Sequence, residues 1–343
     1  MSAPTTQKQY RLVKSGTQGF SLQLTEGSVR APDSDEVLVK MRAASINRRD
    51  IYIVKGFLPV GSRESLVPFS DGAGEVVALG SRVTRLRIGD RVAPNYFADW
   101  IEGRLTAHSL QSGLGGLRDG VLTQYLTIKE SSLALLPGNL SFEEGATLPC
   151  AALTAWSGLF TRGDLRAGDF VLLQGTGGVS IFGLQLALAA GAKPIITSSS
   201  DEKLERARSL GAFGVVNYRK TPDWETAVRD LTGGAGVHQV LEVSGKESIA
   251  RSLASLAIGG HVALIGGLTA FGGDIPVMSL IGPHARASGI YVGSRTDFDA
   301  LNGFIQQNKI KPVIDRVFEF REAQAAYDLM ESNSFFGKIV IRI

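Results

Sequence analysis

One cysteine, Cys150, stands in a chain of 343 residues. A single cysteine excludes an intramolecular disulfide and the cysteine clusters that bind structural zinc, and it is typical of a reducing compartment. Long apolar runs are missing too: no uninterrupted stretch approaches the ~18 residues of a membrane span, and the polar N-terminal segment lacks the apolar core of a signal peptide. We therefore expect a soluble, cytoplasmic protein with no membrane partner.

Neither sign of charge dominates the sequence. Lys and Arg number 36 against 33 Asp and Glu, so the net charge is only +3. We interpret the arginine-rich run at residues 82–91 as a solvated face and expect no nucleic-acid partner. The hydrophobic content of 44% is that of an ordinary globular protein, and the length suffices for two domains.

Glycine, in contrast, is abundant and gathers in one informative turn. Residues 170–174 are mostly apolar and predict a buried strand, and an apolar helical run follows residue 180. A strand, a glycine-rich turn and a helix in succession form the context of a dinucleotide fingerprint, in which the backbone approaches a pyrophosphate at the helix N-terminus. Ser180 stands at the third glycine position of the fingerprint, which requires a small side chain. The turn itself contains Gly175, Thr176, Gly177, Gly178 and Val179.

The alternation of strands and helices continues after this turn and decides the fold class. Strands are predicted at residues 194–199, 215–218, 237–243 and 261–265, with helices at residues 201–210, 224–231 and 249–256 between them. Such alternation indicates an α/β domain with a doubly wound parallel sheet. Residues 1–130 have short apolar stretches between turn signals and a long loop at residues 98–120, so they predict an irregular, mostly β domain.

The positions of these patterns predict the domain boundaries. A helix predicted at residues 143–158 leads into the fingerprint strand, and the alternating pattern loosens after residue 266. We expect residues 1–130 and 280–343 to form the mostly β domain, and residues 131–279 to form the dinucleotide-binding domain.

Six motifs occur in an order that resembles one known superfamily. They are AASINRRDIY at residues 43–52, GAGEVVALG at 72–80, GDRV at 89–92, LPCAALTAW at 148–156, the glycine turn, and GKIV at 337–340. The chain resembles the medium-chain dehydrogenase/reductase superfamily over essentially its whole length, and within it the zinc-free, quinone oxidoreductase-like branch that includes zeta-crystallin. The resemblance implies a GroES-like mostly β catalytic domain plus a Rossmann domain with a doubly wound parallel sheet. It also implies a homodimer, for which residues 286–292 are the candidate edge strand.

The resemblance also bears on metal binding. Zinc alcohol dehydrogenases of the superfamily hold a catalytic zinc with a cysteine, a histidine and a second cysteine, and the surrounding motifs put Asn47, Ser70 and Cys150 at those positions. Asparagine and serine are poor zinc ligands, and the four-cysteine lobe expected around residues 95–115 is missing. We interpret His108 as a loop histidine and expect no metal. Charge on a substrate oxygen must then be stabilised by hydrogen-bond donors, which favours quinones and α,β-unsaturated carbonyls over simple alcohols.

Candidate catalytic residues follow from the motif at residues 43–52. Tyr52 is the first candidate for the hydrogen-bond or proton donor, although a packed, half-buried aromatic ring is an equal alternative and solvent could supply the proton. Asn47 is the candidate that orients the substrate or the nicotinamide ribose. Asp50 is expected to fix local structure, and Arg48 and Arg49 are either surface residues or ligands of an acidic substrate.

The choice of cofactor depends on the end of the second Rossmann strand. Enzymes that use NAD place an acidic residue there to bind both ribose hydroxyls, whereas this chain has Ser199, which leaves room for a 2′-phosphate. Lys203 and Tyr218 match the lysine and tyrosine that embrace this phosphate in NADPH-dependent relatives. Asp201 is the counter-argument, and we interpret it as the cap of the helix that begins there. We predict NADPH. Thr154, Ser244, Ile265, Gly266 and Asn333 match family positions around the nicotinamide.

Three functional hypotheses remain. The first is an NADPH-dependent oxidoreductase that transfers hydride to a quinone or an α,β-unsaturated carbonyl without zinc. The second is a zinc-independent, NAD(P)-dependent alcohol or carbonyl dehydrogenase. The third belongs to another class, a dinucleotide-binding structural or RNA-binding protein with little catalysis.

Overall fold

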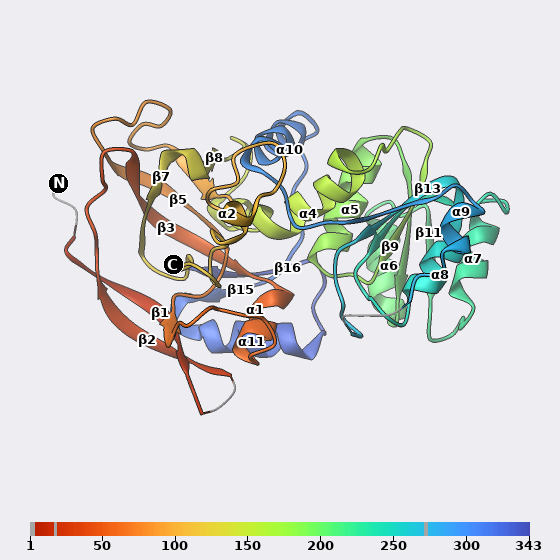
Figure 1. Cartoon of the computed structure of the whole chain (residues 1–343), viewed down its shortest axis with the longest axis horizontal. Helices are drawn as coiled ribbons and strands as arrows, with labels where there is room; N and C mark the ends of the chain where they lie inside the picture. The colour runs from red at the N-terminus through yellow and green to blue at the C-terminus, as the bar shows by residue number, and fades with distance from the viewer. Residues whose placement is uncertain (1–3, 17–18, 271–273) are drawn as a thin grey trace. The chain divides into compact units, whose positions relative to one another are not determined.

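The computed structural model describes residues 4–16, 19–270 and 274–343 and divides into two compact units. Unit 1 consists of Met1–Leu153 and Gly293–Ile343, and unit 2 of Thr154–Val292 (Figure 1). These limits lie later in the chain than the predicted boundaries after residues 130 and 279. The segment after residue 130 stays with unit 1 because its first helix packs against the unit 1 sheet, and the segment after residue 279 adds a strand to the unit 2 sheet.

Unit 1 is the mostly β unit that the sequence predicts. Its main sheet has the order β15-β16-β3-β5-β6-β8, with β7 paired to β3, and a smaller sheet has the order β2-β1-β4. The strands are β1 (Thr6–Lys14), β2 (Phe20–Ser28), β3 (Glu36–Ile46), β4 (Ser65–Leu66), β5 (Asp71–Leu79), β6 (Arg91–Pro94), β7 (Tyr125–Lys129), β8 (Leu133–Leu135), β15 (Ile314–Glu319) and β16 (Lys338–Arg342).

The strand register of unit 1 brings distant parts of the sequence to one edge. Both β16 and β5 run antiparallel to β3, with Ile339 opposite Ile46 and Asp71 opposite Ser45. The first residues of β16 and β5 therefore lie beside the last residues of β3. Because α1 (Arg48–Val54) starts directly after β3, its N-terminus is fixed at this same edge.

The helices of unit 1 are short and cover the sheet locally. The core contains Met41 and Ile46 of β3 together with Phe69 and Tyr327. Helix α11 packs against α1, β15 and β16. The predicted loop at residues 98–120 contains one short helix, α2. The helical elements are α1, α2 (Ala107–Leu110), α3 (Phe142–Gly145), α10 (Arg295–Gln307), α11 (Ala323–Ser332), and the 3-10 turns η1 (Glu130–Ser132) and η4 (Phe320–Glu322).

Unit 2 contains the predicted parallel sheet, in the order β11-β10-β9-β12-β13-β14. Neighbouring strands are all parallel, and helices connect them as in a doubly wound fold. The strands are β9 (Phe170–Gln174), β10 (Lys193–Ser198), β11 (Gly214–Asn217), β12 (Val237–Glu242), β13 (Leu256–Leu264) and β14 (Arg286–Gly289). The helices are α5 (Gly178–Ala189), α6 (Asp201–Ser209), α7 (Trp224–Leu231), α8 (Ile249–Ala254) and α9 (Met278–Ile281).

The helix predicted at residues 143–158 is not a single α-helix. After α3, the chain forms two π-helical segments, η2 (Leu148–Ala152) and η3 (Ser157–Thr161), on either side of α4 (Leu153–Trp156). Pro149 lies at the start of η2 and cannot donate an intrahelical hydrogen bond, which favours a wider turn at this point. Such π-helical turns occur frequently at functional sites; η2 contains Cys150, and Thr154 lies in α4 between the two segments.

No helix among the described residues is long and apolar enough to cross a membrane.

Candidate functional site

The predicted cofactor residues of unit 2 lie along one edge of its sheet. Apart from Thr154 in α4 and Lys203 in α6, they follow the end of a strand, directly or within a short turn, and in parallel strands all carboxyl ends meet at the same edge. In spatial order across the sheet, the edge presents Tyr218 after β11, Ser199 after β10, Gly175 after β9, Ser244 shortly after β12, and Ile265 and Gly266 after β13. The 2′-phosphate candidates thus lie on one side of the glycine turn and the nicotinamide candidates on the other. The structure thus brings these predicted residues to one edge of the sheet.

The glycine turn has the backbone that a pyrophosphate requires. Gly175 has a φ of +70°, in the left-handed region that favours glycine, and its N–H donates to the Thr197 carbonyl at 2.8 Å. Gly177 is the N-cap of α5 and has no side chain with which to cap the first N–H groups of the helix. These N–H groups therefore point to the edge as donors for an anion.

Ser180 fits this turn for a reason that the structure reveals. Its Oγ donates to the Gln174 carbonyl at 2.5 Å, so the hydroxyl bonds back to the end of β9. Helix α5 also packs closely on the sheet one turn later, at Gly183, where a Cβ atom would lie 2.8 Å from Leu173 and 2.9 Å from Leu241. Gly183 is thus a packing residue that the fingerprint spacing did not identify.

A buried carboxylate holds the loop that carries Ser244. Oε1 of Glu242 accepts hydrogen bonds from the N–H groups of Ser244 and Gly245, both at 2.9 Å, and from Ser248 Oγ at 2.7 Å. Its Oε2 accepts from Gln174 Nε2 at 2.7 Å and from Ser252 Oγ. Glu242 is not among the predicted site residues, although an acidic residue at the end of an apolar strand is a signal for such a role.

The acidic residue nearest the predicted 2′-phosphate position is already engaged. The structure corrects the interpretation of Asp201 as a helix cap: Ser200 is the N-cap of α6, and its Oγ accepts from the N–H of Lys203. Asp201 accepts from Asn217 Nδ2 at 2.6 Å and pairs with Lys220, and these hydrogen bonds lower the pKa of its carboxyl group. A ribose hydroxyl at this carboxylate would compete with both partners.

In unit 1, Asn47 meets a buried lysine that the sequence analysis did not select. Asn47 is the N-cap of α1, and Lys338 is the first residue of β16. Nζ of Lys338 donates to Asn47 Oδ1 at 2.6 Å and to the Ile46 carbonyl at 3.1 Å, and it lies 3.8 Å from Asp71 Oδ2. The lysine side chain is only 3% exposed. The signal in the sequence is weak, because Lys338 is 291 residues away from Asn47.

Asp71 joins this lysine to the other two positions that correspond to zinc ligands. Asp71 accepts from Ser70 Oγ at 2.6 Å and from the N–H of Cys150 at 3.2 Å. Burial raises the pKa of Asp71, and Lys338, Ser70 and the Asn47 amide oppose the rise. Burial also raises the pKa of the Cys150 thiol, which disfavours a metal-binding thiolate.

This donor set does not fit a zinc ion. The described residues contain no group of three His, Cys, Asp or Glu side chains able to hold a metal. One of the three expected ligand positions, Asn47, directs its oxygen to an ammonium group, and a second, Ser70, donates its hydroxyl to a carboxylate.

Tyr52 lies on another side of the same helix. It lies five positions after Asn47, which corresponds to roughly 140° around an α-helix. Its charged neighbour is Arg48, and its ring lies 6.4 Å from that of Phe57, which is 69% exposed. The sequence motif therefore supplies two polar groups that point in different directions.

The two arginines of the motif have different environments. The side chain of Arg48 donates to Asn333 Oδ1, which brings the predicted residue Asn333 to the start of α1 within unit 1. Arg49 is not a surface residue: its side chain is 14% exposed, donates to the Leu114 carbonyl at 2.7 Å and lies over the Tyr96 ring at 4.8 Å. The Arg49 guanidinium is therefore engaged by other residues of unit 1.

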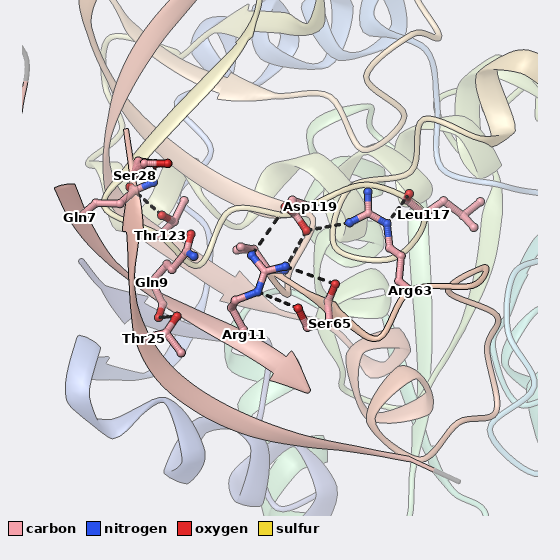
Figure 2. Close-up of polar contacts among 11 residues, drawn as sticks. Gln7, Gln9, Arg11, Thr25, Ser28, Arg63, Ser65, Leu117, Asp119 and Thr123 are labelled. Carbon is pink, nitrogen blue, oxygen red and sulfur yellow. Dashed lines mark hydrogen bonds and ion pairs between the residues drawn. The ribbon is translucent and has the colours of Figure 1, made fainter. Parts of the chain in front are cut away.

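A cleft of about 380 Å³ lies against β1 in unit 1. Figure 2 shows that polar side chains lining it bond to neighbouring residues: Arg11 donates to Ser65 Oγ at 3.0 Å, and Asp119 accepts from Arg63 at 2.9 Å. Thr123 Oγ1 donates to Gln7 at 2.8 Å. The groups hold β1 against the neighbouring loops, so we assign the cleft a role in packing.

Two features are typical of a two-domain oxidoreductase: the edge of the unit 2 sheet that carries the predicted dinucleotide residues, and the polar residues around Asn47 in unit 1. Residues 33–138 match the alcohol dehydrogenase GroES-like domain, and residues 178–307 match the zinc-binding dehydrogenase domain. The chain belongs to the medium-chain dehydrogenase/reductase superfamily, as predicted.

Known proteins similar to this chain carry several functional names. A zinc-type alcohol dehydrogenase-like protein of Schizosaccharomyces pombe is 44% identical over 90% of this chain and 91% of its own length. A solved structure from Sinorhizobium meliloti 1021, provisionally described as an alcohol dehydrogenase, is 36% identical, covers 100% of both chains and has a TM-score of 0.94. The quinone oxidoreductase of Pseudomonas syringae pv. Tomato DC3000 is 25% identical over 98% of this chain and 100% of its own, with a TM-score of 0.81. The protein is thus an alcohol dehydrogenase-like oxidoreductase.

The carboxyl group of Asp50 provides a test of this polar region. Burial raises the pKa of Asp50 to about 6. Arg49 and the N–H of Asn47 act in the opposite direction and lower it. Because the folded pKa exceeds the unfolded one, the native state binds the proton more tightly. Asp50 therefore contributes stability below about pH 4, and this contribution is lost as the pH rises through 6.

We expect Asp50→Asn, which keeps the acceptor for the N–H of Asn47, to gain stability relative to wild type between pH 4 and pH 7, by on the order of 2 kcal/mol. Thermal midpoints at several pH values measure this difference. Asp35→Asn, at a side chain that is 47% exposed, is the matched control and should show no such trend. A wild-type-minus-variant difference that is constant across this pH range would contradict the account.

Proposed function

We propose that the protein is an NADPH-dependent reductase of quinones or α,β-unsaturated carbonyls and that it works without zinc. One observation carries the proposal: an ammonium group bonds to Asn47, at the position of a zinc ligand, in a donor set that does not suit a metal. A reaction without a Lewis acid favours acceptors that delocalise the incoming electron pair. The similarity to a quinone oxidoreductase supports the same choice.

The chain's own residues divide the work. The bound dinucleotide supplies a hydride, and the glycine turn and the loop held by Glu242 orient it. Asn47 hydrogen-bonds the acceptor oxygen, on which negative charge develops as the carbon–hydrogen bond forms. Tyr52 or solvent delivers the proton that completes the reduction.

The preference for NADPH rests on the engagement of Asp201. Its carboxylate is bonded to Asn217 and paired with Lys220, while the residue at the end of β10 is Ser199, whose hydroxyl tolerates a phosphate. Lys203 lies in the first turn of α6, which follows β10. Tyr218 follows β11, the strand next to β10 in the sheet. We propose that these residues bind the 2′-phosphate.

Cofactor titration tests this assignment. We expect the wild type to bind NADPH more tightly than NADH. Quenching of protein fluorescence during the titration measures both affinities. The pair Ser199→Asp and Lys203→Ala should reverse this preference, because it removes a cation and adds a carboxylate that repels phosphate but accepts from ribose hydroxyls. Lys193→Ala, at the opposite end of β10, also removes one lysine cation and should leave the preference unchanged. Tighter binding of NADH to the wild type would contradict the assignment.

Substrate profiling separates the proposal from its rivals. We expect the wild type to oxidise NADPH with 1,4-naphthoquinone and cyclohex-2-enone and to show little turnover of ethanol or propan-2-ol. If Tyr52 delivers the proton, Tyr52→Phe should have a lower kcat. Turnover of alcohols without reduction of quinones or enones would favour an alcohol dehydrogenase, which the names of the relatives also suggest. Tight NADPH binding without oxidation by any acceptor would favour a dinucleotide-binding protein with little catalysis.

We also propose that the protein is a cytoplasmic homodimer joined through unit 2. Strand β14 is the last strand of its sheet. Exposed apolar side chains occur in the neighbouring strand β13, where Ile258 is 86% exposed, and in α9 shortly before β14, where Met278 is 69% and Ile281 63% exposed. A second copy that extends the sheet would cover such side chains. We expect a dimer mass by light scattering and a monomer for Met278→Asp with Ile281→Asp. Ile88→Asp, at a unit 1 side chain that is 68% exposed, is the control. A monomeric wild type would contradict the proposal.

A further inference from the structure

Glu242 contacts three of the residues predicted to surround the nicotinamide. Its side chain accepts hydrogen bonds from the N–H groups of Ser244 and Gly245 in the loop after β12. Its main-chain carbonyl accepts from the N–H of Ile265 at 2.9 Å and from that of Gly266 at 3.3 Å, directly after β13. Glu242 therefore lies where these two neighbouring strands present the predicted nicotinamide residues.

The groups around the Glu242 carboxylate are all placed as donors. Its two oxygens accept from two main-chain N–H groups, from Ser248 Oγ, from Gln174 Nε2 and from Ser252 Oγ. Gln174 Oε1 accepts from the N–H of Ser244 at 3.3 Å, so its NH₂ group faces Glu242. Ser252 Oγ accepts from this NH₂ group at 2.7 Å and therefore donates to Glu242. These donors fill the roughly four lone-pair positions of a carboxylate, so Glu242 is ionised.

This buried charge has no cation beside it. Glu242 is only 1% exposed, and no lysine or arginine pairs with it among the residues that the structure describes. In unit 1, by contrast, Lys338 pairs with the buried Asp71. Hydrogen bonds from neutral donors stabilise a carboxylate but leave its net charge in place, and a protein interior screens such a charge far less than water does. The negative potential of Glu242 therefore extends to the loops that it holds.

We propose that Glu242 is a positioning residue whose charge also sets the balance between the two oxidation states of the bound cofactor. This inference rests on the proposed function. NADPH supplies a hydride from a neutral nicotinamide ring, and the ring of NADP⁺ carries a positive charge. The Glu242 carboxylate attracts the charged ring and has little effect on the neutral one. It thus favours NADP⁺ over NADPH in the bound state.

The sign of this attraction suits a reductase. During transfer the acceptor carbon gains the hydride, the acceptor oxygen takes the electron pair of the π bond and then a proton, and NADPH is oxidised to NADP⁺. Because positive charge develops on the ring as the hydride leaves, a fixed negative charge lowers the free energy of this step. A purely structural Glu242 would act differently, since the loss of rigid loops weakens the binding of both oxidation states alike.

The first experiment compares the loss of the charge with the loss of one hydrogen bond. Glu242→Gln keeps the size of the side chain and removes its charge, whereas Ser252→Ala removes one donor and keeps the charge. Titrations with NADP⁺ and with NADPH give the two Kd values. We expect the ratio of the Kd for NADP⁺ to the Kd for NADPH to rise on the order of 10-fold in Glu242→Gln. In Ser252→Ala both Kd values should rise by a similar factor.

The thermal midpoint identifies the folded variants in this comparison. An unchanged ratio of Kd values in a folded Glu242→Gln would overturn the proposal. A change of the same size in Ser252→Ala would overturn it as well, because that variant retains the carboxylate.

The second experiment remains informative if Glu242→Gln does not fold, for its new NH₂ group would face that of Gln174. The double variant Gln174→Glu with Glu242→Gln exchanges amide and carboxylate and keeps one charge. The double variant Gln174→Met with Glu242→Gln removes the opposing donor and leaves no charge. We expect a ratio of Kd values near that of the wild type in the first and on the order of 10-fold higher in the second. Equal ratios in these two variants would contradict the proposal.

Failure of the proposed function is distinguishable from failure of this inference, because Kd values need no turnover. If the wild type reduces neither 1,4-naphthoquinone nor cyclohex-2-enone while the ratio changes as expected, the proposed function fails and the role of Glu242 stands. If the wild type binds NADH more tightly than NADPH, the same ratio is measured with NAD⁺ and NADH. A lower kcat in Glu242→Gln at an unchanged ratio leaves Glu242 a structural role alone and overturns the inference.

Discussion

The fold of unit 1 depends on one buried ammonium group at the edge where three strands meet. Lys338 begins β16, Ile46 ends β3 and Asp71 begins β5, and the antiparallel register of these strands brings the three residues together. Nζ bonds to the Ile46 carbonyl and to Asn47, and it pairs with Asp71 at 3.8 Å. A buried charge is tolerated only where such partners surround it. The same contacts that join the strands also fix the start of α1, so strand pairing and the orientation of Asn47 have a common cause.

In unit 2, the predicted cofactor residues come from several strands, and the order of the strands fixes the order of these residues. Its sheet places Tyr218, Ser199, Gly175, Ser244 and Ile265 along one edge, in the sequence of the parts of a dinucleotide. The edge needs no exact side chain at the pyrophosphate, because backbone N–H groups of α5 point to it. It does need rigid loops, and Glu242 supplies this with hydrogen bonds to the N–H groups of Ser244 and Gly245.

The sequence predicted unit 2 well and the contacts of unit 1 poorly, for a physical reason. Strand, glycine turn and helix are local patterns, and so the strand at residues 170–174 and the helix at residues 224–231 appear in the structure as predicted. The cluster around Asn47 is assembled by strand register between distant segments. In the sequence, Lys338 is only one residue of a C-terminal motif, and Asp71 is only the neighbour of Ser70. Neither spacing nor composition indicates that the two side chains meet. The hairpin of β1 and β2 was missed within a segment described only as mostly β. The boundaries after residues 130 and 279 were placed too early, because β14 pairs with β13 and α3 packs on unit 1.

The central claim is that a fixed ammonium and amide stand where a metal would otherwise act. The most direct measurement is the zinc content per chain of protein purified without chelator, determined together with the rate of NADPH-dependent naphthoquinone reduction before and after added zinc. The account predicts far less than one zinc per chain, full activity in that state, and no increase when zinc is added. One zinc per chain, with activity that rises in proportion to zinc content, would contradict it.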